Sequence, residues 1–177
     1  MASIIKVDQI QTAAGGTPTA ADLGLNTTGS VLQVVSVANN NYQEVTSTTY
    51  TDTATTASIT PSSTSSKILV VVTGNMTMIR AAQSIWGNAR IYRDSTSNLV
   101  WQSDYFGNIS AGTDAIGENK VANNIAVQVL DSPATTSSVT YTLQIAAGTT
   151  ASDGRVRLNN SSNKTNASNI TLMEIAG

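Results

Sequence analysis

The sequence predicts an all-β protein: an antiparallel β-sandwich of the jelly-roll kind, preceded by an extended N-terminal anchoring segment. First, charged residues make up only 11% of the 177-residue chain, and Ser, Thr and Asn supply its polar groups instead, which favours strands and turns over solvent-facing helices. Second, short apolar runs with the period of a strand recur between turn signals, without any long helical pattern. An immunoglobulin-type sandwich is the alternative, but the chain contains no cysteine and lacks the Cys–Trp–Cys signature of that fold.

Residues 1–29 differ in character from the rest. We expect them to form an N-terminal arm, followed by a β-sandwich domain over residues 30–177. Within the arm one helical turn can form, with Thr19 as its N-cap, Asp22 at its third position and Gly24 as its stop.

Four aliphatic side chains of the arm should be buried against another chain. They are Ile4, Ile5, Val7 and Ile10. They precede a flexible break at Gly15–Pro18, and the segment is too short and too broken to form a core of its own. Leaving a large aliphatic side chain in water costs roughly 1.5–3 kcal/mol. We therefore expect these four residues to anchor the arm to a partner.

The first two predicted strands of the domain differ in composition. Val31–Val37 is apolar on both faces and is therefore expected at the centre of a sheet. Thr48–Thr60 is rich in Thr and has few apolar residues, which suits an exposed edge strand.

The sandwich should be built around the strand Lys67–Ile79. Its even positions form an unbroken apolar row, which predicts one face that is buried along the whole strand. Its odd positions begin apolar with Leu69 and Val71 and turn polar from Thr73, so the opposite face should be buried only in its first half. A strand that is buried on both faces at one end belongs at the centre of a two-layer structure.

The second half of the chain supplies the remaining strands, for a total of about eight to ten. Ala89–Asp94 and Leu99–Phe106 are expected to pair as a hairpin around residues 95–98, and residues 107–123 to form a long loop. Val139–Ile145 alternates most clearly and is predicted to be half-buried. Further strands are expected at 125–129, at 156–158 and, closing the chain, at Ile170–Ile175.

Composition excludes several classes of function. The chain has no His and no Cys, so a catalytic triad, a cysteine nucleophile and a thiolate zinc site cannot be built. The net charge is −2 and no basic patch is visible, so we expect no nucleic-acid partner. Neither a signal peptide nor a membrane span is apparent, so no membrane insertion is expected. We also expect no cofactor, no metal site and no catalytic residues.

The enzymatic option that remains is a carboxylate pair for glycoside hydrolysis, drawn from Asp104, Asp114 and Glu118. These residues are more simply explained as solvating a loop.

Four aromatic residues are candidates for contact with a glycan. They are Trp86, Trp101, Tyr105 and Phe106, and they cluster in sequence around the predicted hairpin. Aromatic faces can stack on sugar rings, but such residues more often fill a core or a subunit interface. This second interpretation is strongest for Trp101, which alternates in phase with Leu99.

Both ends of the chain resemble a known class of proteins. Ser3–Gln11, Gly15–Pro18 and Ala21–Leu25 resemble the start of many tail-fibre and virion-surface proteins of marine bacteriophages, cyanophages especially. The final Ile170–Ile175 resembles the last strand of their jelly-roll domains. The resemblance implies an N-terminal segment that attaches to the virion and a distal β-rich domain that is usually trimeric.

The residues and the resemblance together predict a structural protein of a bacteriophage virion. It would be a short tail-fibre-like or surface-fibre protein on the particle surface, homotrimeric, and attached to other virion proteins by its arm. Adhesion to a host-surface glycan would be an added role. The alternatives are a capsid decoration or head-fibre protein, a carbohydrate-binding module, and a glycan-cleaving enzyme on the same scaffold.

Overall fold

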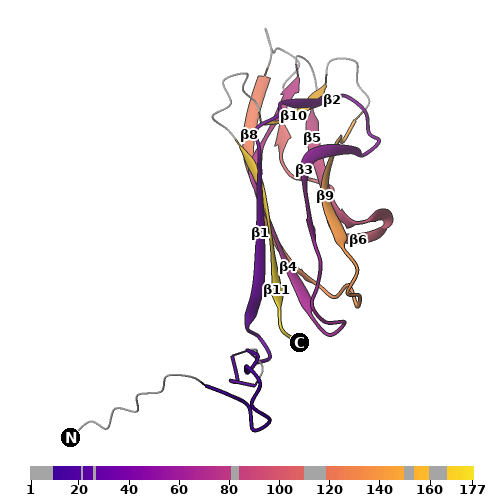
Figure 1. Ribbon diagram of the computed structural model, residues 1–177. Helices are drawn as coiled ribbons and strands as arrows, with labels where there is room; N and C mark the ends of the chain where they lie inside the picture. Colours follow the sequence, from indigo (N-terminus) through magenta and orange to yellow (C-terminus); the bar gives the residue numbers. More distant parts are fainter. Residues whose placement is uncertain are drawn as a thin grey trace, which may run out of the picture.

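The computed structural model is an antiparallel β-sandwich preceded by an N-terminal arm (Figure 1). It describes residues 10–20, 22–25, 27–80, 84–109, 119–149, 154–159 and 167–177. These ranges contain eleven strands and no helix. The predicted all-β class and the two-layer antiparallel architecture are therefore confirmed.

The strands form two sheets. The first sheet contains β1 (Val31–Asn39), β2 (Gln43–Val45), β4 (Lys67–Arg80), β8 (Asn119–Asp131), β10 (Arg155–Leu158) and β11 (Ser168–Ile175). The second contains β3 (Thr51–Ile59), β5 (Ile85–Arg93), β6 (Ser95–Ser103), β7 (Asn108–Ile109) and β9 (Val139–Ala147). In the first sheet, β8 pairs along one edge of β4, while β11 and β10 share the other edge.

The order of the long strands is that of a jelly roll. One sheet reads β1-β11-β4-β8 and the other reads β3-β9-β5-β6. The chain crosses to the second sheet for β3, returns for β4, crosses for β5 and β6, returns for β8, crosses for β9 and ends at β11 beside its first strand. This interlocking of two Greek keys explains why the last strand pins the C-terminus into a sheet.

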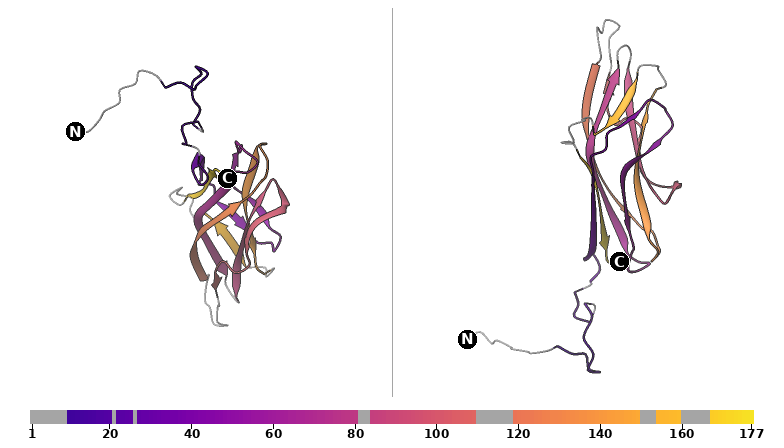
Figure 2. Two further views of the ribbon diagram at one scale, coloured as in Figure 1. Left: turned by 90° about the horizontal axis from the view of Figure 1, so that it is seen from below. Right: turned by 45° about the horizontal axis from the view of Figure 1, so that its top comes forward.

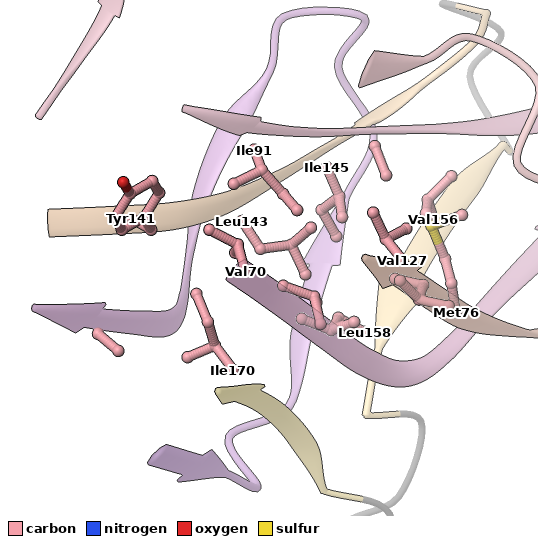
Figure 3. Packing of buried hydrophobic residues seen from close by; sticks show 14 of the residues in the cluster. Val70, Met76, Ile91, Val127, Tyr141, Leu143, Ile145, Val156, Leu158 and Ile170 are labelled. Carbon is pink, nitrogen blue, oxygen red and sulfur yellow. The ribbon is translucent and has the colours of Figure 1, made fainter. Parts of the chain in front are cut away.

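The core lies between the two sheets and confirms the predicted inward row of β4. Ile68, Val70 and Val72 are fully buried. They belong to one apolar cluster with Leu143 and Ile145 of β9, and Figure 3 shows the labelled side chains of both sheets meeting in this space.

For the opposite face of β4, the predicted distribution of buried and exposed residues is wrong. Leu69 and Val71 are only half-buried, although Thr73 is exposed as expected. The second half, which should have been open, contains Ile79 with no exposed surface. Ile79 lies in register between Arg155 of β10 and Lys120 of β8, whose aliphatic stems can cover apolar neighbours.

The predictions for two further strands are wrong, one in its position in the sheet and the other in its burial. β1 lies at an edge, not at the centre, and Val34 on its outward face is 55% exposed. β9 is buried on both faces, not half-buried, because it lies between β3 and β5, whose polar side chains cover its outward Thr142 and Gln144. The predicted edge position of the Thr-rich strand β3 is confirmed.

The hairpin of β5 and β6 is confirmed, but its turn is tighter than predicted. The chain reverses at Asp94, which has a φ of 58°, and residues 95–98 belong to β6. The backbone N–H of Asp94 donates to the carbonyl of Thr140, and the Asp94 carboxylate accepts from the Thr140 N–H, which holds the turn. The predicted loop at 107–123 is interrupted, since β7 and the start of β8 lie in it.

The arm extends from the end of the sandwich at which the C-terminus lies (Figures 1 and 2). Its junction is held by two backbone hydrogen bonds of 2.8 Å, from Gly29 N–H to Ala176 O and from Ala176 N–H to Ser30 O. The predicted capping contact is present, because Asp22 accepts from the N–H and hydroxyl of Thr19 at 2.8 Å each. These two bonds hold the pKa of Asp22 below its usual range. The turn is not continued as a helix.

Candidate functional site

The four candidate aromatic residues separate into two pairs. Trp86 and Tyr105 stack with ring centroids 5.3 Å apart, and we call them the aromatic pair. Trp101 and Phe106 meet edge to face at 5.9 Å and pack against the hydrophobic core. The structure therefore does not assemble the four residues into one surface.

The alternation of β5 places Trp86 outside the sandwich. Gly87 points inward, where an added Cβ would lie 2.8 Å from Cε of Met76, so the facing sheet leaves room only for hydrogen at this position. Trp86 points outward, and its indole lies over Gly148, whose missing side chain makes room for the ring. Tyr105 is 68% exposed, so the aromatic pair offers a ring face to solvent.

A polar network that sequence reasoning missed lies on the same outward face of the second sheet. Its members are Tyr50, Asp52, Arg90, Tyr92, Gln102, Asp104 and Gln144, and we call it the outer polar network. Its base is one register row across three strands, in which Arg90 of β5 faces Gln144 of β9, and Gln144 faces Asp52 of β3. Arg90 Nε donates to Gln144 Oε1, and Gln144 Nε2 donates to Asp52 Oδ1 at 2.6 Å.

Aromatic hydroxyls complete the outer polar network. The guanidinium of Arg90 lies 4.2 Å above the centre of the Tyr50 ring. The Tyr50 hydroxyl donates to Asp104 Oδ1 at 3.1 Å, and the Tyr92 hydroxyl donates to Asp52 Oδ1 at 3.1 Å. Burial, followed by the hydrogen bond to Asp104, raises the pKa of Tyr50 to about 12. Burial is also the first cause that raises the pKa of Tyr92. Both phenols therefore remain protonated donors at neutral pH.

One depression borders Tyr105 of the aromatic pair, and a second lies towards the middle of β4 and β8. The first has a volume of about 460 Å³ and is lined by Ser103, Tyr105, Phe106, Gly107, Asn123 and Asn124. The other, of about 470 Å³, lies over β4 and β8 and is lined by Thr73, Gly74, Asn75, Asn124, Ile125, Ala126 and Ala167. In the first depression Asn123 Nδ2 donates to the carbonyl of Phe106, which fixes the chain after β6.

Of the four predicted anchoring residues, only Ile10 lies in the described part of the arm, and it is 54% exposed. Ile4, Ile5 and Val7 lie outside the described residues. Sequence reasoning did not single out Leu23 and Leu25, which are 46% and 64% exposed. The arm thus carries three exposed aliphatic side chains among its described residues.

The carboxylates considered for hydrolysis are only partly described. Asp104 belongs to the outer polar network, whereas Asp114 and Glu118 lie outside the described residues. Among the described residues, no three acidic side chains gather as metal ligands would. The same part of the chain holds no helix of the length and apolarity that crossing a membrane requires.

Comparison with known proteins identifies no family. No protein-family model and no curated protein matches the chain. Among solved structures it is similar to the infectious bursal disease virus VP2 subviral particle, with a TM-score of 0.38 and 11% identity over 81% of this chain and 37% of that chain. It is also similar to a structure of the Gx strain of that virus, with a TM-score of 0.33 and 14% identity over 82% of this chain and 37% of that chain. The chain thus spans little more than a third of the matched proteins. Likeness at these TM-scores carries no argument about function, and the jelly-roll order rests on the strand pairing itself.

Proposed function

We propose that this chain is a structural protein of a bacteriophage virion, a short tail-fibre-like or surface-fibre protein with an adhesive distal end. The observation that carries the proposal is the placement of the arm and the aromatic pair at opposite ends of the sandwich. The arm joins at Ala176, next to the pair formed by Ile175 and Lys67 at the start of β4. Tyr105 lines a depression with Asn123, which lies in register with Met76 near the far end of β4. At about 3.3 Å per residue, these positions are roughly 30 Å apart. One end can therefore attach to a particle while the other contacts a host surface.

The arm is the proposed attachment segment. Its exposed Ile10, Leu23 and Leu25 find no core within the chain as described, and burying each against a partner would stabilise the complex by roughly 1.5–3 kcal/mol. The resemblance of the same segment to the N-termini of virion-surface proteins supports other virion proteins as its partners.

The outer face of the first sheet supports a homotrimer as the assembled form. Four apolar residues stand in one register row across β1, β11, β4 and β8, and we call them the apolar row: Val34, Met173, Leu69 and Leu130. Val34 is 55% and Leu130 is 51% exposed. An uncharged apolar row of this kind is typical of the centre of a subunit interface. Three copies packed around an axis along the strands would cover it and would release all three arms at the same end.

Deletion of residues 2–29 tests the proposed attachment. We expect the truncated protein to remain a soluble, cooperatively folding β domain, because two backbone hydrogen bonds at Gly29 and Ser30 form the arm's junction with the sandwich. Circular dichroism and thermal melting check this expectation. We also expect the truncated protein to be missing from particles, measured by mass spectrometry of purified virions.

The matched control keeps the arm but replaces exposed polar residues, as in Thr17→Ser with Thr28→Ser, and should be incorporated normally. A second variant, Leu23→Ser with Leu25→Ser, should be incorporated poorly. Normal incorporation of the truncated protein would contradict attachment through the arm.

A further inference from the structure

We infer that the outward face of the second sheet is a binding site for a neutral oligosaccharide, with the outer polar network as its hydrogen-bonding centre and the aromatic pair as its stacking platform. The inference rests on the proposed function only in that it names the ligand of the adhesive contact. The site itself follows from the chemistry of one face of the sheet.

Arg90 supplies unused donors at the centre of this face. A guanidinium carries five N–H donors in a rigid fork. Of these five donors of Arg90, only Nε–H has an acceptor among the described residues, which is Gln144 Oε1. The ring of Tyr50 below the guanidinium holds its plane in place. The four remaining N–H groups are thus oriented in advance and are available to the hydroxyl and ring oxygens of a ligand.

Two carboxylates supply unused acceptors beside Arg90. Asp104 uses Oδ1 to accept from Tyr50 and Gln102, and Asp52 uses Oδ1 to accept from Gln144 and Tyr92. Among the described residues neither Oδ2 atom has a hydrogen-bond donor, and both residues are exposed. A carboxylate held by one oxygen and open at the other is suited to receive sugar hydroxyl groups.

The outward row of β5 joins this centre to the aromatic pair. Trp86, Asn88 and Arg90 alternate on one face, so Trp86 and Arg90 are about 13 Å apart along the strand. Asn88 between them has a side-chain oxygen that is enclosed and has no hydrogen-bond partner in the described part of the chain. Because this oxygen is enclosed, it is not itself a contact for a ligand lying along β5. The length of the row suits a ligand of more than one sugar ring.

The charge of the outer polar network favours neutral over acidic sugars. Its charged members are Asp52, Asp104 and Arg90, which sum to −1. A sialic acid or a uronic acid would bring its carboxylate close to two others, and like charges at a binding face oppose association. A neutral sugar can use both the acceptors and the donors.

The test measures binding of the full-length protein to immobilised oligosaccharides. Each neutral glycan, such as a lactose-terminated or a galactan oligosaccharide, is paired with its sialylated or uronate counterpart. We expect neutral members of the pairs to bind and their acidic counterparts to bind at least about tenfold more weakly. Preference for the acidic members, or binding of no neutral glycan, would overturn the inference.

Variants of the protein locate the site. Calorimetry measures their affinity for the neutral glycan that binds most tightly. Arg90→Ala and Tyr105→Ala should each weaken binding about tenfold or more. Since Tyr105 is an exposed residue, its variant keeps the test valid should Arg90→Ala lose its fold. The matched control is Arg157→Ala, because Arg157 also lies over a tyrosine, Tyr42 at 5.5 Å, but on the other sheet. Equal loss in the control, or none in Tyr105→Ala, would overturn the location.

The outcome is distinguishable from that of the proposed function. The protein without residues 2–29 should bind the glycan as the full chain does, whether or not it joins particles. Glycan binding by a protein that is absent from virions would uphold this inference and overturn the proposed function. Incorporation of the protein into virions without glycan binding would uphold the proposed function and overturn this inference.

Discussion

Adjacent residues of β4 lie in opposite environments, one buried and one exposed. This difference decides which substitutions each position can accept. Val72 is completely buried between the sheets, whereas Thr73 is exposed on the outer face of the first sheet. In register, Val72 lies between Ile170 and Val127, and Thr73 between Asn169 and Ala126. The burial of the neighbours therefore follows the same alternation, since Ile170 and Val127 are buried and Ala126 is exposed.

Val72→Asp should abolish folding, whereas Thr73→Asp should be tolerated. An unpaired buried carboxylate costs several kcal/mol even after its pKa shifts, comparable to the roughly 5–15 kcal/mol that stabilises a whole domain. On the exposed face the same change should cost no more than about 0.5–1 kcal/mol. Soluble yield and melting temperature of the two variants check the expectation. Equal damage from both would mean that Thr73 is covered in the assembled protein.

At the scale of elements, a buried carboxylate of β11 organises the connection between β3 and β4. Glu174 has no exposed surface. Its Oε1 accepts from the N–H and the hydroxyl of Ser62, at 2.7 Å and 2.6 Å, and its Oε2 accepts from Gln33 Nε2 of β1 at 2.6 Å. Burial alone would raise the pKa of Glu174, but the hydrogen bonds, with those of Ser62 first, outweigh it and hold the pKa below its usual range. The last strand, the first strand and a loop are thus joined through one ionised group.

Glu174→Gln should lower the free energy of unfolding at pH 7 by about 2–4 kcal/mol, because an amide nitrogen would then face donors. The lowered pKa of the folded state means that the wild-type advantage is present above the unfolded value of about 4.3 and is lost as the pH falls through the folded value. Thermal melts from pH 7 to pH 3 should therefore converge for the two proteins.

The control is Glu44→Gln, which removes a carboxylate paired with Arg157 at the surface and should cost no more than about 1 kcal/mol at pH 7. A difference between wild type and Glu174→Gln that persists unchanged to pH 3 would contradict the assigned role of the ionised carboxylate.

At the scale of the whole molecule, the two outward faces of the sandwich have different chemistry. The first sheet presents the apolar row, with Val34 and Leu130 about half exposed. The second sheet presents the outer polar network and the aromatic pair. An apolar face suits contact with other copies of the chain, and a polar face with exposed rings suits a hydrophilic ligand. A trimer packed through the first sheet would leave the second sheet open on each subunit.

Light scattering of the full-length protein at micromolar concentration should give the mass of a trimer. Leu130→Lys should shift it to monomer, because three lysines would then be brought into the interface. Since Leu130 is already half exposed, the subunit fold should remain intact by circular dichroism. The control, Ser58→Lys on the outward face of the second sheet, should remain trimeric. A wild-type monomer would exclude the assembly, and a dimer would remove the analogy with phage fibres.

Much of the fold can be predicted from the sequence because a strand alternates its side chains every second residue. The inward row of β4, the pairing of β5 with β6 and the closing strand β11 all follow from this local rule. The same rule also indicated the exposed surface of Thr73. Contact of Trp101 with the core is confirmed, but its predicted phase with Leu99 is not, because the register of β6 shifts between them and Leu99 is 49% exposed.

The candidate site could be predicted only in part, because its members come together from distant segments. Trp86 and Tyr105 were recognisable as aromatic residues near the hairpin. Nothing local connects Tyr50, Arg90 and Gln144, which meet only because β3, β9 and β5 lie side by side. Asp104 joins them through the Tyr50 hydroxyl, across 54 residues of chain.

By itself, the sequence determined the class of fold, the inward row of β4 and the edge position of β3. Only the tertiary structure decided that Val31–Val37 lies at an edge and that Val139–Ile145 lies at a centre covered on both faces. The physical reason is that alternation is enforced by the backbone of a single strand. The position of a strand in its sheet depends instead on which distant segments pair with it. Here the last strand, β11, pairs with both β1 and β4, which leaves β1 at the edge.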